Sequence, residues 1–284
     1  MVIERVGVVG CGLMGSGIAE VCARAGVDVL VREIDENALT AGRRRIEASL
    51  ERARSRGKVS DAEVATAMAR LRFTTDLGEF GDRQLVLEAV PESEALKLDV
   101  FATLDKVVAG DAVLASNTSA IPIMKLAMAT GRPEQVLGLH FFSPVPVLKL
   151  VELVTSLLTG AAAAATVRAF AEEALGKRVI TSKDRAGFIV NSLLIPYLIA
   201  AVRMLESGFA SAEDIDAGMV LGCNHPMGPL ALADFIGLDT TLAAAQSMYE
   251  EFKEPLYAPP PMLSRMVEAG LLGRKTGRGF YSYG

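Results

Sequence analysis

One of the chain's two histidines lies in a context suited to proton transfer. His140 ends an apolar run in the segment GLHFFSPVP, and Glu152 interrupts the next apolar run, LKLVELV. A carboxylate buried in a strand is costly without a partner, and Lys149 and His140 are the candidates. A carboxylate behind an imidazole sets its tautomer and stabilises its protonated form. The arrangement therefore predicts that His140 and Glu152 form a general acid–base pair.

A second group of polar residues follows an apolar run in the segment ASNTSA. Asn117, Thr118 and Ser119 would lie at the carboxyl end of a strand, the edge where open α/β sheets bind ligands. Ser119 also stands just ahead of Ile121 and Pro122, a favourable helix start, so it is equally a candidate helix cap. Capping and ligand contact are compatible, and both interpretations stay open.

Two further polar residues lie in the second half of the chain. Asn191, in the apolar segment GFIVNSLL, needs a hydrogen-bond partner if it is buried, and either a ligand or a neighbouring helix would supply one. His225 lies in NHPMGP, among proline and glycine. This composition is typical of a turn, so we interpret His225 as a turn or cap residue.

A glycine-rich segment, GCGLMGSGIAEVCARAG, follows a short apolar strand and opens a helix. Gly10, Gly12 and Gly15 have the spacing of the dinucleotide-binding turn, in which the backbone and the helix N-terminus bind a pyrophosphate. Glu33 ends the next strand, where it can accept hydrogen bonds from the adenosine ribose and repel a 2′-phosphate. NAD is therefore favoured over NADP, although Arg32 beside it weakens the preference. The predicted turn contacts are Gly10, Cys11, Gly12, Leu13, Met14 and Gly15.

A basic stretch lies in the next helical segment. Its cationic residues are Arg43, Arg44, Arg45, Arg52, Arg54, Arg56 and Lys58. Such a run is most often a solvated helix face. Because arginine binds phosphate oxygens well, the alternative is a site for a phosphorylated ligand. The residues alone do not decide between these interpretations.

The elements that must position these residues alternate along the first part of the chain. Apolar runs predict strands at 3–9, 27–33, 85–90, 112–116, 137–142 and 147–154. Helical patterns occupy 93–108 and 120–130, and 36–72 is predicted as a helical pair. Alternation of this kind predicts a doubly wound, mostly parallel α/β sheet of the Rossmann type with a helical arm. Beyond the boundary only helices are expected, so we predict a dinucleotide-binding domain over 1–184 and an all-α domain over 185–284.

Composition narrows the function further. Half of the residues are hydrophobic, which excludes a disordered chain. The net charge of −5 argues against general nucleic-acid binding. The three cysteines have no CxxC pair and no metal-ligand spacing, which suits a reducing compartment. No signal peptide or membrane span is recognised. The expectation is a cytoplasmic protein without a metal site.

Taken together, these motifs resemble the L-3-hydroxyacyl-CoA dehydrogenase family, and within it the short bacterial 3-hydroxybutyryl-CoA dehydrogenases. The resemblance runs nearly end to end. It rests on GCGLMGSGIAE, LASNTSA, GLHFFSPVPVLKLVEL, AGFIVN, DIDAGMVLGCNHPMGPL, DFIGLD and GRKTGRGFYSY. One position departs from the family: many members read HFFNP, whereas Ser143 stands here in place of the asparagine.

The resemblance implies roles for individual residues. His140 matches the family's catalytic base and Glu152 its partner, while Ser119 and Asn191 match residues that hold the reacting oxygens of the substrate. The matching cofactor contacts are Glu92, Lys97, Asn117, Ser119 and Lys275. Ser49 and Arg56 fall where the family's helical arm contacts coenzyme A, although the family usually carries lysine near Arg56.

The resemblance also implies the reaction and the assembly. The expected reaction interconverts a 3-hydroxyacyl-CoA and a 3-ketoacyl-CoA with NAD, and the C-terminal helices would form a homodimer. Two alternatives are an NAD-dependent dehydrogenase of a sugar acid, of the gulonate type, and a non-catalytic NADH sensor. A sugar-acid substrate would not need the basic arm, and a sensor would leave the His140–Glu152 pair unexplained.

Overall fold

The computed structural model describes residues 2–284, which divide into two compact units. The first unit ends at Asp184 and the second begins at Arg185. Each unit has a hydrophobic core of its own.

The first unit is built on a sheet that, within the described residues, has eight strands in the order β3-β2-β1-β4-β5-β6-β7-β8. Strands β1 to β6 are mutually parallel, β7 runs antiparallel to β6, and β8 is parallel to β7. The strands are β1 (Arg5–Val9), β2 (Asp28–Arg32), β3 (Leu71–Thr74), β4 (Leu85–Glu88), β5 (Val113–Ser116), β6 (Val136–Phe141), β7 (Leu150–Thr155) and β8 (Arg178–Lys183). The predicted Rossmann-type, mostly parallel fold is confirmed.

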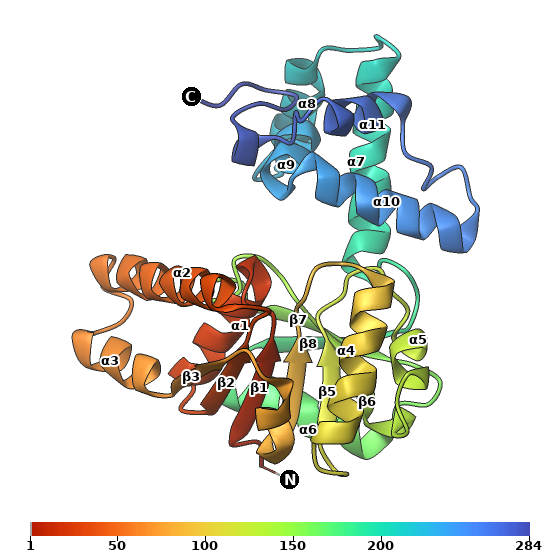
Figure 1. The fold of residues 1–284 in the computed structure, drawn as a ribbon. Coiled ribbons are helices and arrows are strands. Elements are labelled where there is room, and N and C mark those ends of the chain that lie inside the picture. The colour runs from red at the N-terminus through yellow and green to blue at the C-terminus, as the bar shows by residue number, and fades with distance from the viewer. Residues whose placement is uncertain (1) are drawn as a thin grey trace. The chain divides into compact units, whose positions relative to one another are not determined.

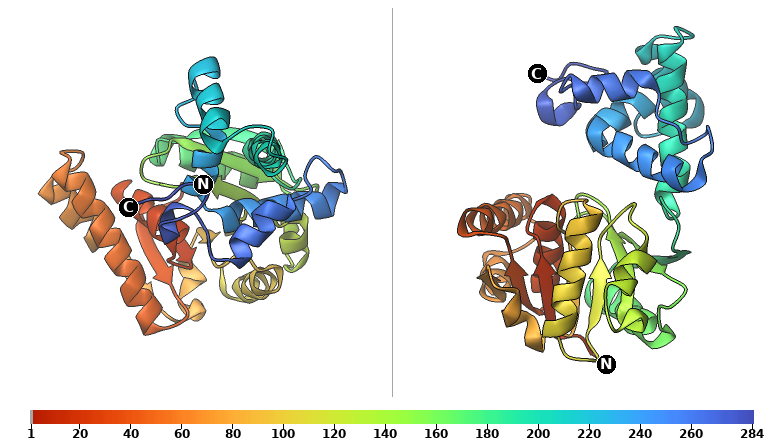
Figure 2. Two further views of the ribbon diagram at one scale, coloured as in Figure 1. Left: turned by 90° about the horizontal axis from the view of Figure 1, so that it is seen from above. Right: turned by 45° about the vertical axis from the view of Figure 1, so that its right-hand side comes forward.

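Helices cover both faces of this sheet (Figures 1 and 2). The helices of this unit are α1 (Leu13–Arg24), α2 (Glu36–Ser55), α3 (Asp61–Ala69), α4 (Glu94–Val107), α5 (Ile123–Met128) and α6 (Ala161–Ala169). Side chains of α1 and α6 share one apolar core with the sheet, and α4 and α5 lie on the opposite face (Figure 1). This two-sided cover accounts for the uninterrupted apolar character of the strands.

Helices α2 and α3 form the predicted arm, which projects beside the edge of the sheet that carries β2 and β3 (Figure 1). Asp35 caps α2 by accepting a hydrogen bond from Ala38 N at 2.8 Å. Ser60 and Glu63 form a reciprocal capping box at the start of α3. Leu39, Ile46 and Leu50 are buried on α2, so one face of the arm packs on the sheet domain and leaves the other to solvent.

Two edge strands are missing from the sequence-based prediction. The predicted helical pair over 36–72 is too long, because α3 ends at Ala69 and residues 71–74 form β3. Strand β8, with the sequence RVITSK, also lies at the edge of the sheet. Both strands are partly polar, and the apolar runs that mark the central strands are absent from them.

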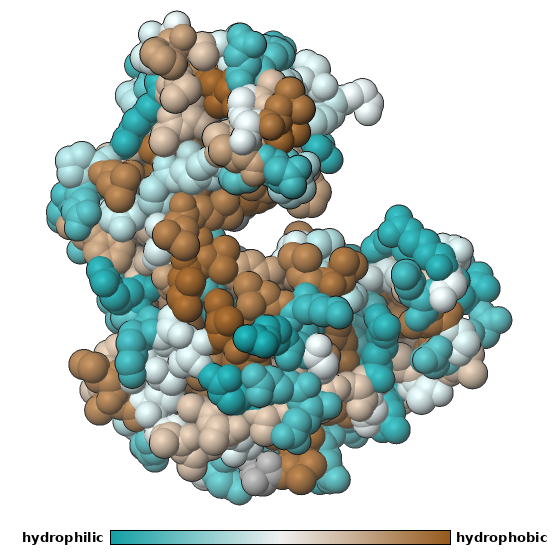
Figure 3. Space-filling view, turned by 180° about the vertical axis from the view of Figure 1, so that it is seen from behind, coloured by the Kyte–Doolittle hydropathy of each residue, from teal (hydrophilic) through white to brown (hydrophobic). Residues whose placement is uncertain are grey.

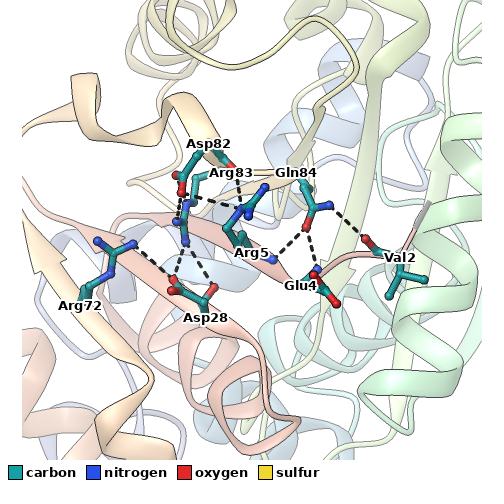
Figure 4. Close-up of polar contacts among 8 residues, drawn as sticks. All are labelled: Val2, Glu4, Arg5, Asp28, Arg72, Asp82, Arg83 and Gln84. Carbon is teal, nitrogen blue, oxygen red and sulfur yellow. Dashed lines mark hydrogen bonds and ion pairs between the residues drawn. The ribbon is translucent and has the colours of Figure 1, made fainter.

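A polar network ties the amino-terminal edge of the sheet together (Figure 4). The side chain of Arg83 is fully buried. Its guanidinium donates to both carboxylate oxygens of Asp82 at 2.7 Å and to Asp28 Oδ1 at 2.6 Å. Gln84 Oε1 accepts from the amides of Glu4 and Arg5 at 2.8 and 3.0 Å. The network joins the starts of β1, β2 and β4 at the edge opposite the predicted site.

The second unit is built from helices and contains no strand among its described residues, in agreement with the prediction. Its helices are α7 (Val190–Glu206), α8 (Ala212–Cys223), α9 (Pro229–Ile236), α10 (Leu238–Phe252) and α11 (Pro261–Glu268). Two buried carboxylates organise it. Asp216 accepts from the first amides of α9, Leu230 N and Ala231 N, at 2.8 and 2.9 Å. Asp234 accepts from Phe280 N and Tyr281 N, both at 3.0 Å, and so anchors the C-terminal segment.

Candidate active site

The glycine turn joins β1 to α1 at the carboxyl edge of the sheet. Gly10 has a φ of +91°, and a Cβ there would lie 2.7 Å from the carbonyl oxygen of Ala89. A Cβ on Gly15 would lie 1.8 Å from the carbonyl oxygen of Gly10. A Cβ on Gly12, in contrast, would meet nothing within 4 Å. Gly10 and Gly15 therefore allow the turn to pack tightly on neighbouring backbone. Gly12 leaves space beside the turn for a ligand.

The start of α1 has the properties of a phosphate-binding helix end. Gly12 is the N-cap residue, no side chain caps the helix, and its first turn carries no acidic residue. The first amides of a helix have no partner within the helix, so Leu13 and Met14 present donors at this open end. Together with the open surface at Gly12, these donors fit a dinucleotide pyrophosphate.

Cys11 is held from several sides within this turn. Its amide donates to Glu33 Oε1 at 2.6 Å, and its carbonyl oxygen accepts from Arg45 Nη1 at 3.2 Å. Gly42 of α2 packs so closely that a Cβ there would lie 2.6 Å from Cys11 Sγ. Burial, followed by the charge of Glu33, raises the pKa of the Cys11 thiol to about 12. Cys11 is therefore a buried neutral thiol that docks the arm on the turn.

His140 and Glu152 face each other on adjacent strands. The antiparallel register of β6 and β7 pairs these two residues directly, and His140 Nδ1 lies 2.7 Å from Glu152 Oε2. His140 is buried and Glu152 is fully buried. The ring of Phe142 packs on the imidazole, with 4.6 Å between the ring centroids. A buried carboxylate bonded to Nδ1 directs proton exchange with a substrate to Nε2.

Asn117 and Ser119 follow β5 at the same edge. Asn117 Oδ1 accepts from Phe141 N at 2.8 Å, which joins the end of β5 to the end of β6 beside His140. Ser119 N donates to Glu92 Oε1 at 3.2 Å. Within residues 2–284, no protein group is hydrogen-bonded to the hydroxyl of Ser119. The structure thus brings Ser119, Asn117, Glu92 and His140 to one edge of the sheet.

Ser119 is not a helix cap, so that interpretation of the sequence is wrong. Thr118 stabilises the turn ahead of the helix instead. Its hydroxyl accepts a hydrogen bond from Ile121 N at 2.9 Å and is also hydrogen-bonded to Glu92. Helix α5 begins later, at Ile123, and Asp184 accepts from its first amides, Ile123 N and Met124 N, at 2.8 and 2.7 Å. A distant carboxylate therefore performs the capping that the local pattern assigned to Ser119.

Lys97, a predicted cofactor contact, is buried with 1% of its surface exposed. Its Nζ donates to Glu88 Oε1 at 2.6 Å and to Val90 O at 3.3 Å, and it lies 3.3 Å from Glu92 Oε2. Glu88, the residue at the centre of this cluster, is not among the residues predicted from the sequence. The one signal for it is a carboxylate at the end of an otherwise apolar strand.

The arm places the predicted coenzyme A contacts on α2 and directly after it. Ser49 is half-buried and Arg56 is exposed at the end of the helix. Two arginines of the basic stretch already have carboxylate partners: Arg43 pairs with Glu47 at 2.9 Å, and Arg54 with Glu51 at 2.7 Å. Among residues 2–284, no carboxylate forms an ion pair with Arg44, Arg52, Arg56 or Lys58. These four cationic side chains are therefore the ones in the basic stretch that are available to bind a phosphate group.

Three of the residues named from the sequence belong to the second unit. Asn191 is half-buried in the first turn of α7, and no hydrogen bond to another helix is found for it in the described chain. Lys275 Nζ lies 2.6 Å from both carboxylate oxygens of Asp239. His225 lies in the turn between α8 and α9, where Nδ1 is 3.1 Å from the hydroxyl of Tyr197. This placement agrees with a structural role for His225.

Comparison with known proteins gives matches along both units. Residues 5–185 match the NAD binding domain of 3-hydroxyacyl-CoA dehydrogenase, and residues 187–283 match the C-terminal domain of the same family. The chain is 62% identical over 282 residues to a 3-hydroxybutyryl-CoA dehydrogenase of Mycobacterium tuberculosis, which covers 99% of each sequence.

Solved structures give the same result. The crystal structure of M. tuberculosis FadB2 matches with a TM-score of 0.99 and 62% identity, covering 100% of both chains. That of the (S)-3-hydroxybutyryl-CoA dehydrogenase PaaH1 from Ralstonia eutropha matches with a TM-score of 0.94 and 45% identity, covering 99% of both. Matches of this extent over both units, together with the glycine turn and the buried histidine–carboxylate pair, show that the chain belongs to the 3-hydroxyacyl-CoA dehydrogenase family.

Proposed function

We propose that the protein interconverts (S)-3-hydroxyacyl-CoA and 3-ketoacyl-CoA with NAD(H), and that its substrate is short, of the 3-hydroxybutyryl-CoA type. The observation that carries the proposal is the buried His140–Glu152 pair, 2.7 Å apart, at the sheet edge that also holds the glycine turn. The names of the relatives with high identity over the full chain support the substrate class.

The cofactor contacts of the proposal lie around the turn and the neighbouring loops. When bound there, NAD⁺ would supply the acceptor for the hydride of the substrate's C3. The residues proposed to form the cofactor site in the first unit are Gly10, Cys11, Gly12, Leu13, Met14, Gly15, Glu33, Glu92, Lys97, Asn117 and Ser119. Lys275 is proposed from the second unit. Because Lys97 is buried behind Glu92, we assign it a positioning role. The carboxylate of Glu33 favours NAD over NADP.

The proton chemistry belongs to His140. In the oxidative direction its Nε2 takes the proton of the C3 hydroxyl as the C3–H bond breaks, and in the reductive direction it returns that proton to the oxygen. Glu152 stabilises the imidazolium that forms. Ser119 and Asn191 hold the substrate oxygens, which lowers the barrier mainly by orientation.

The helical arm is proposed to bind the phosphates of coenzyme A through Ser49 and Arg56. Reversing the charge in Arg56→Glu is expected to raise KM for acetoacetyl-CoA by about five- to tenfold, since one exposed charge contact is worth about 1 kcal/mol. KM for NADH should not change. The matched control is Lys106→Glu, an equal charge change near the end of α4, at the opposite edge of the sheet. Equal KM values for both variants would remove Arg56 from the site.

A homodimer formed through the second unit is also part of the proposal. Leu193, Phe209 and Leu221 of this unit are 74%, 77% and 83% exposed, and Figure 3 shows apolar patches on the molecular surface.

A cytoplasmic location is proposed because Cys11, Cys22 and Cys223 are all free thiols in the described chain. Separately, the described helices include none that is both long and apolar enough to cross a membrane.

The experiment that tests the proposed function is NADH oxidation by the purified protein with acetoacetyl-CoA. Turnover at a kcat of at least about 1 s⁻¹, in the ordinary range for enzymes, is the expected result. The oxidation of L-gulonate with NAD⁺ is measured beside it. Turnover of gulonate alone would replace the acyl-CoA substrate with a sugar acid. NADH binding with no turnover of either compound would favour the alternative that the protein is a non-catalytic NADH sensor.

A further inference from the structure

Glu88 ends β4, the strand between β1 and β5 in the sheet. Its side chain is fully buried, and it bonds to groups on three other segments of the chain. Oε1 accepts from Lys97 Nζ at 2.6 Å and from Val90 N at 2.7 Å. Oε2 accepts from the hydroxyl of Ser116 at 2.6 Å. Burying this carboxylate is tolerable because a paired ammonium and further donors replace the lost water.

On one side, Glu88 determines the position of the loop that follows β4. The bond to Val90 N fixes the residues directly against the glycine turn, where a Cβ added to Gly10 would lie 2.9 Å from Val90 N. Lys97 continues the cluster to Glu92, 3.3 Å from its Nζ. The loop after β4, which lies against the glycine turn, therefore depends on one buried carboxylate.

On the other side, Glu88 determines the position of the loop that follows β5. The hydroxyl of Ser116, which donates to Glu88, accepts from Thr118 N at 3.1 Å. The backbone oxygen of Glu88 accepts from Asn117 N at 2.9 Å. Asn117 in turn bonds Phe141 N beside His140. The loop that presents Ser119 is thus attached to the same strand end as the dinucleotide loop.

We propose that Glu88 is a positioning residue of the dehydrogenase reaction, a proposal that rests on the function proposed above. Its carboxylate holds the loop after β4 and the loop after β5 in the mutual arrangement that brings the cofactor and the substrate oxygens together. Glu88 does not itself touch either ligand. Both the charge and the length of the Glu88 side chain are needed. The charge neutralises the ammonium group of Lys97, and the length allows the carboxylate to bond Lys97 and Ser116 at once.

The test separates these two requirements. Glu88→Gln keeps the reach and removes the charge, and Glu88→Asp keeps the charge and shortens the reach. Both variants are expected to raise the Kd and KM for NADH and to lower kcat, each by at least about tenfold, because a displacement of about 1 Å at a reacting centre costs up to 10²-fold. Ser116→Ala removes one bond of the cluster and should raise KM for NADH about threefold, and it decides the proposal if neither Glu88 variant folds.

The control is the double variant Asp28→Asn/Asp82→Asn at the opposite edge, which loses stability without touching the site. Its KM and kcat should remain within about twofold of wild type at a temperature where all variants are folded by circular dichroism. Glu88 variants that behave like this control, with a lower Tm and unchanged kinetics, would overturn the proposal. If the wild type does not turn over acetoacetyl-CoA, the proposed function fails, and the Kd for NADH alone decides the role of Glu88.

Discussion

Replacing His140 by alanine is expected to lower kcat for acetoacetyl-CoA reduction by about 10²- to 10⁴-fold, the range that one positioned acid–base group supplies. The imidazole is buried against Glu152 and Phe142, so bulk water does not take its place easily. KM values should change much less, because the lost interaction acts on the transferring proton. The measurement is the steady-state rate of NADH oxidation with and without the substitution.

Two further variants separate chemistry from folding in this experiment. His140→Asn places its amide nitrogen where Nδ1 stands and so keeps a donor for Glu152. It should be as inactive as His140→Ala while retaining more stability. Glu152→Gln keeps the hydrogen bond but removes the charge that stabilises the imidazolium, and we expect an intermediate loss of kcat of about 10²-fold.

The matched control is His225→Ala, which removes the other histidine of the chain. Because His225 lies in a turn and contacts Tyr197, its loss should leave kcat unchanged. Equal rates in His140→Ala and His225→Ala would falsify the assignment of His140 as the acid–base group.

The second large effect is expected at the opposite edge of the sheet, in the network of Figure 4. The double variant Asp28→Asn/Asp82→Asn leaves the guanidinium of Arg83 buried without a carboxylate. Removing the partner of a fully buried ion pair costs about 3–5 kcal/mol of unfolding free energy. Because only the guanidinium is buried here and the two carboxylates are about half exposed, we expect the lower end of that range, about 3 kcal/mol. Arg83→Met should cost less, because it removes the buried charge and returns two partly exposed carboxylates to water. Urea denaturation of the three proteins measures the difference.

The same network predicts how stability depends on pH. Its bonds to Arg83 lower the pKa of Asp82. For Asp28, burial acts to raise the pKa, but the bonds and charges of Arg83 and Arg72 outweigh it, so the pKa is lowered. Both groups therefore hold their proton more weakly in the folded protein than in the unfolded chain. Their contribution is complete above the unfolded pKa of about 3.9 and is lost as the pH falls through the lowered folded values.

A control variant distinguishes this network from ordinary surface pairs. Glu51→Gln removes a carboxylate from the exposed Arg54 on the arm and should leave the unfolding free energy unchanged. If the Asp28→Asn/Asp82→Asn variant were as stable as wild type, the prediction would be wrong. The two carboxylates would then not be needed to stabilise the buried guanidinium of Arg83.

Features whose signals lie within a few residues of one another could be predicted from the amino-acid order alone. The glycine turn, the helix that it opens and Glu33 directly after the next strand all lie in one continuous segment, because a strand–turn–helix unit is a local structure. The alternation of apolar runs and helical patterns likewise predicted the sheet and the change to a helical unit. It also marked His140 and Glu152 as unusual residues within apolar strands.

The contacts between these residues, in contrast, depend on how the folded chain brings distant segments together. Glu152 faces His140 because β7 runs antiparallel to β6 in one particular register, and no local period encodes that direction. Thr118 and Asp184, rather than Ser119, complete the start of α5. Glu88 becomes the centre of the site's framework through Lys97 and Ser116. The cause is the same in each case. A buried polar group finds its hydrogen-bond partners on segments that are distant in the sequence, and the packing of the elements determines which segments lie beside it.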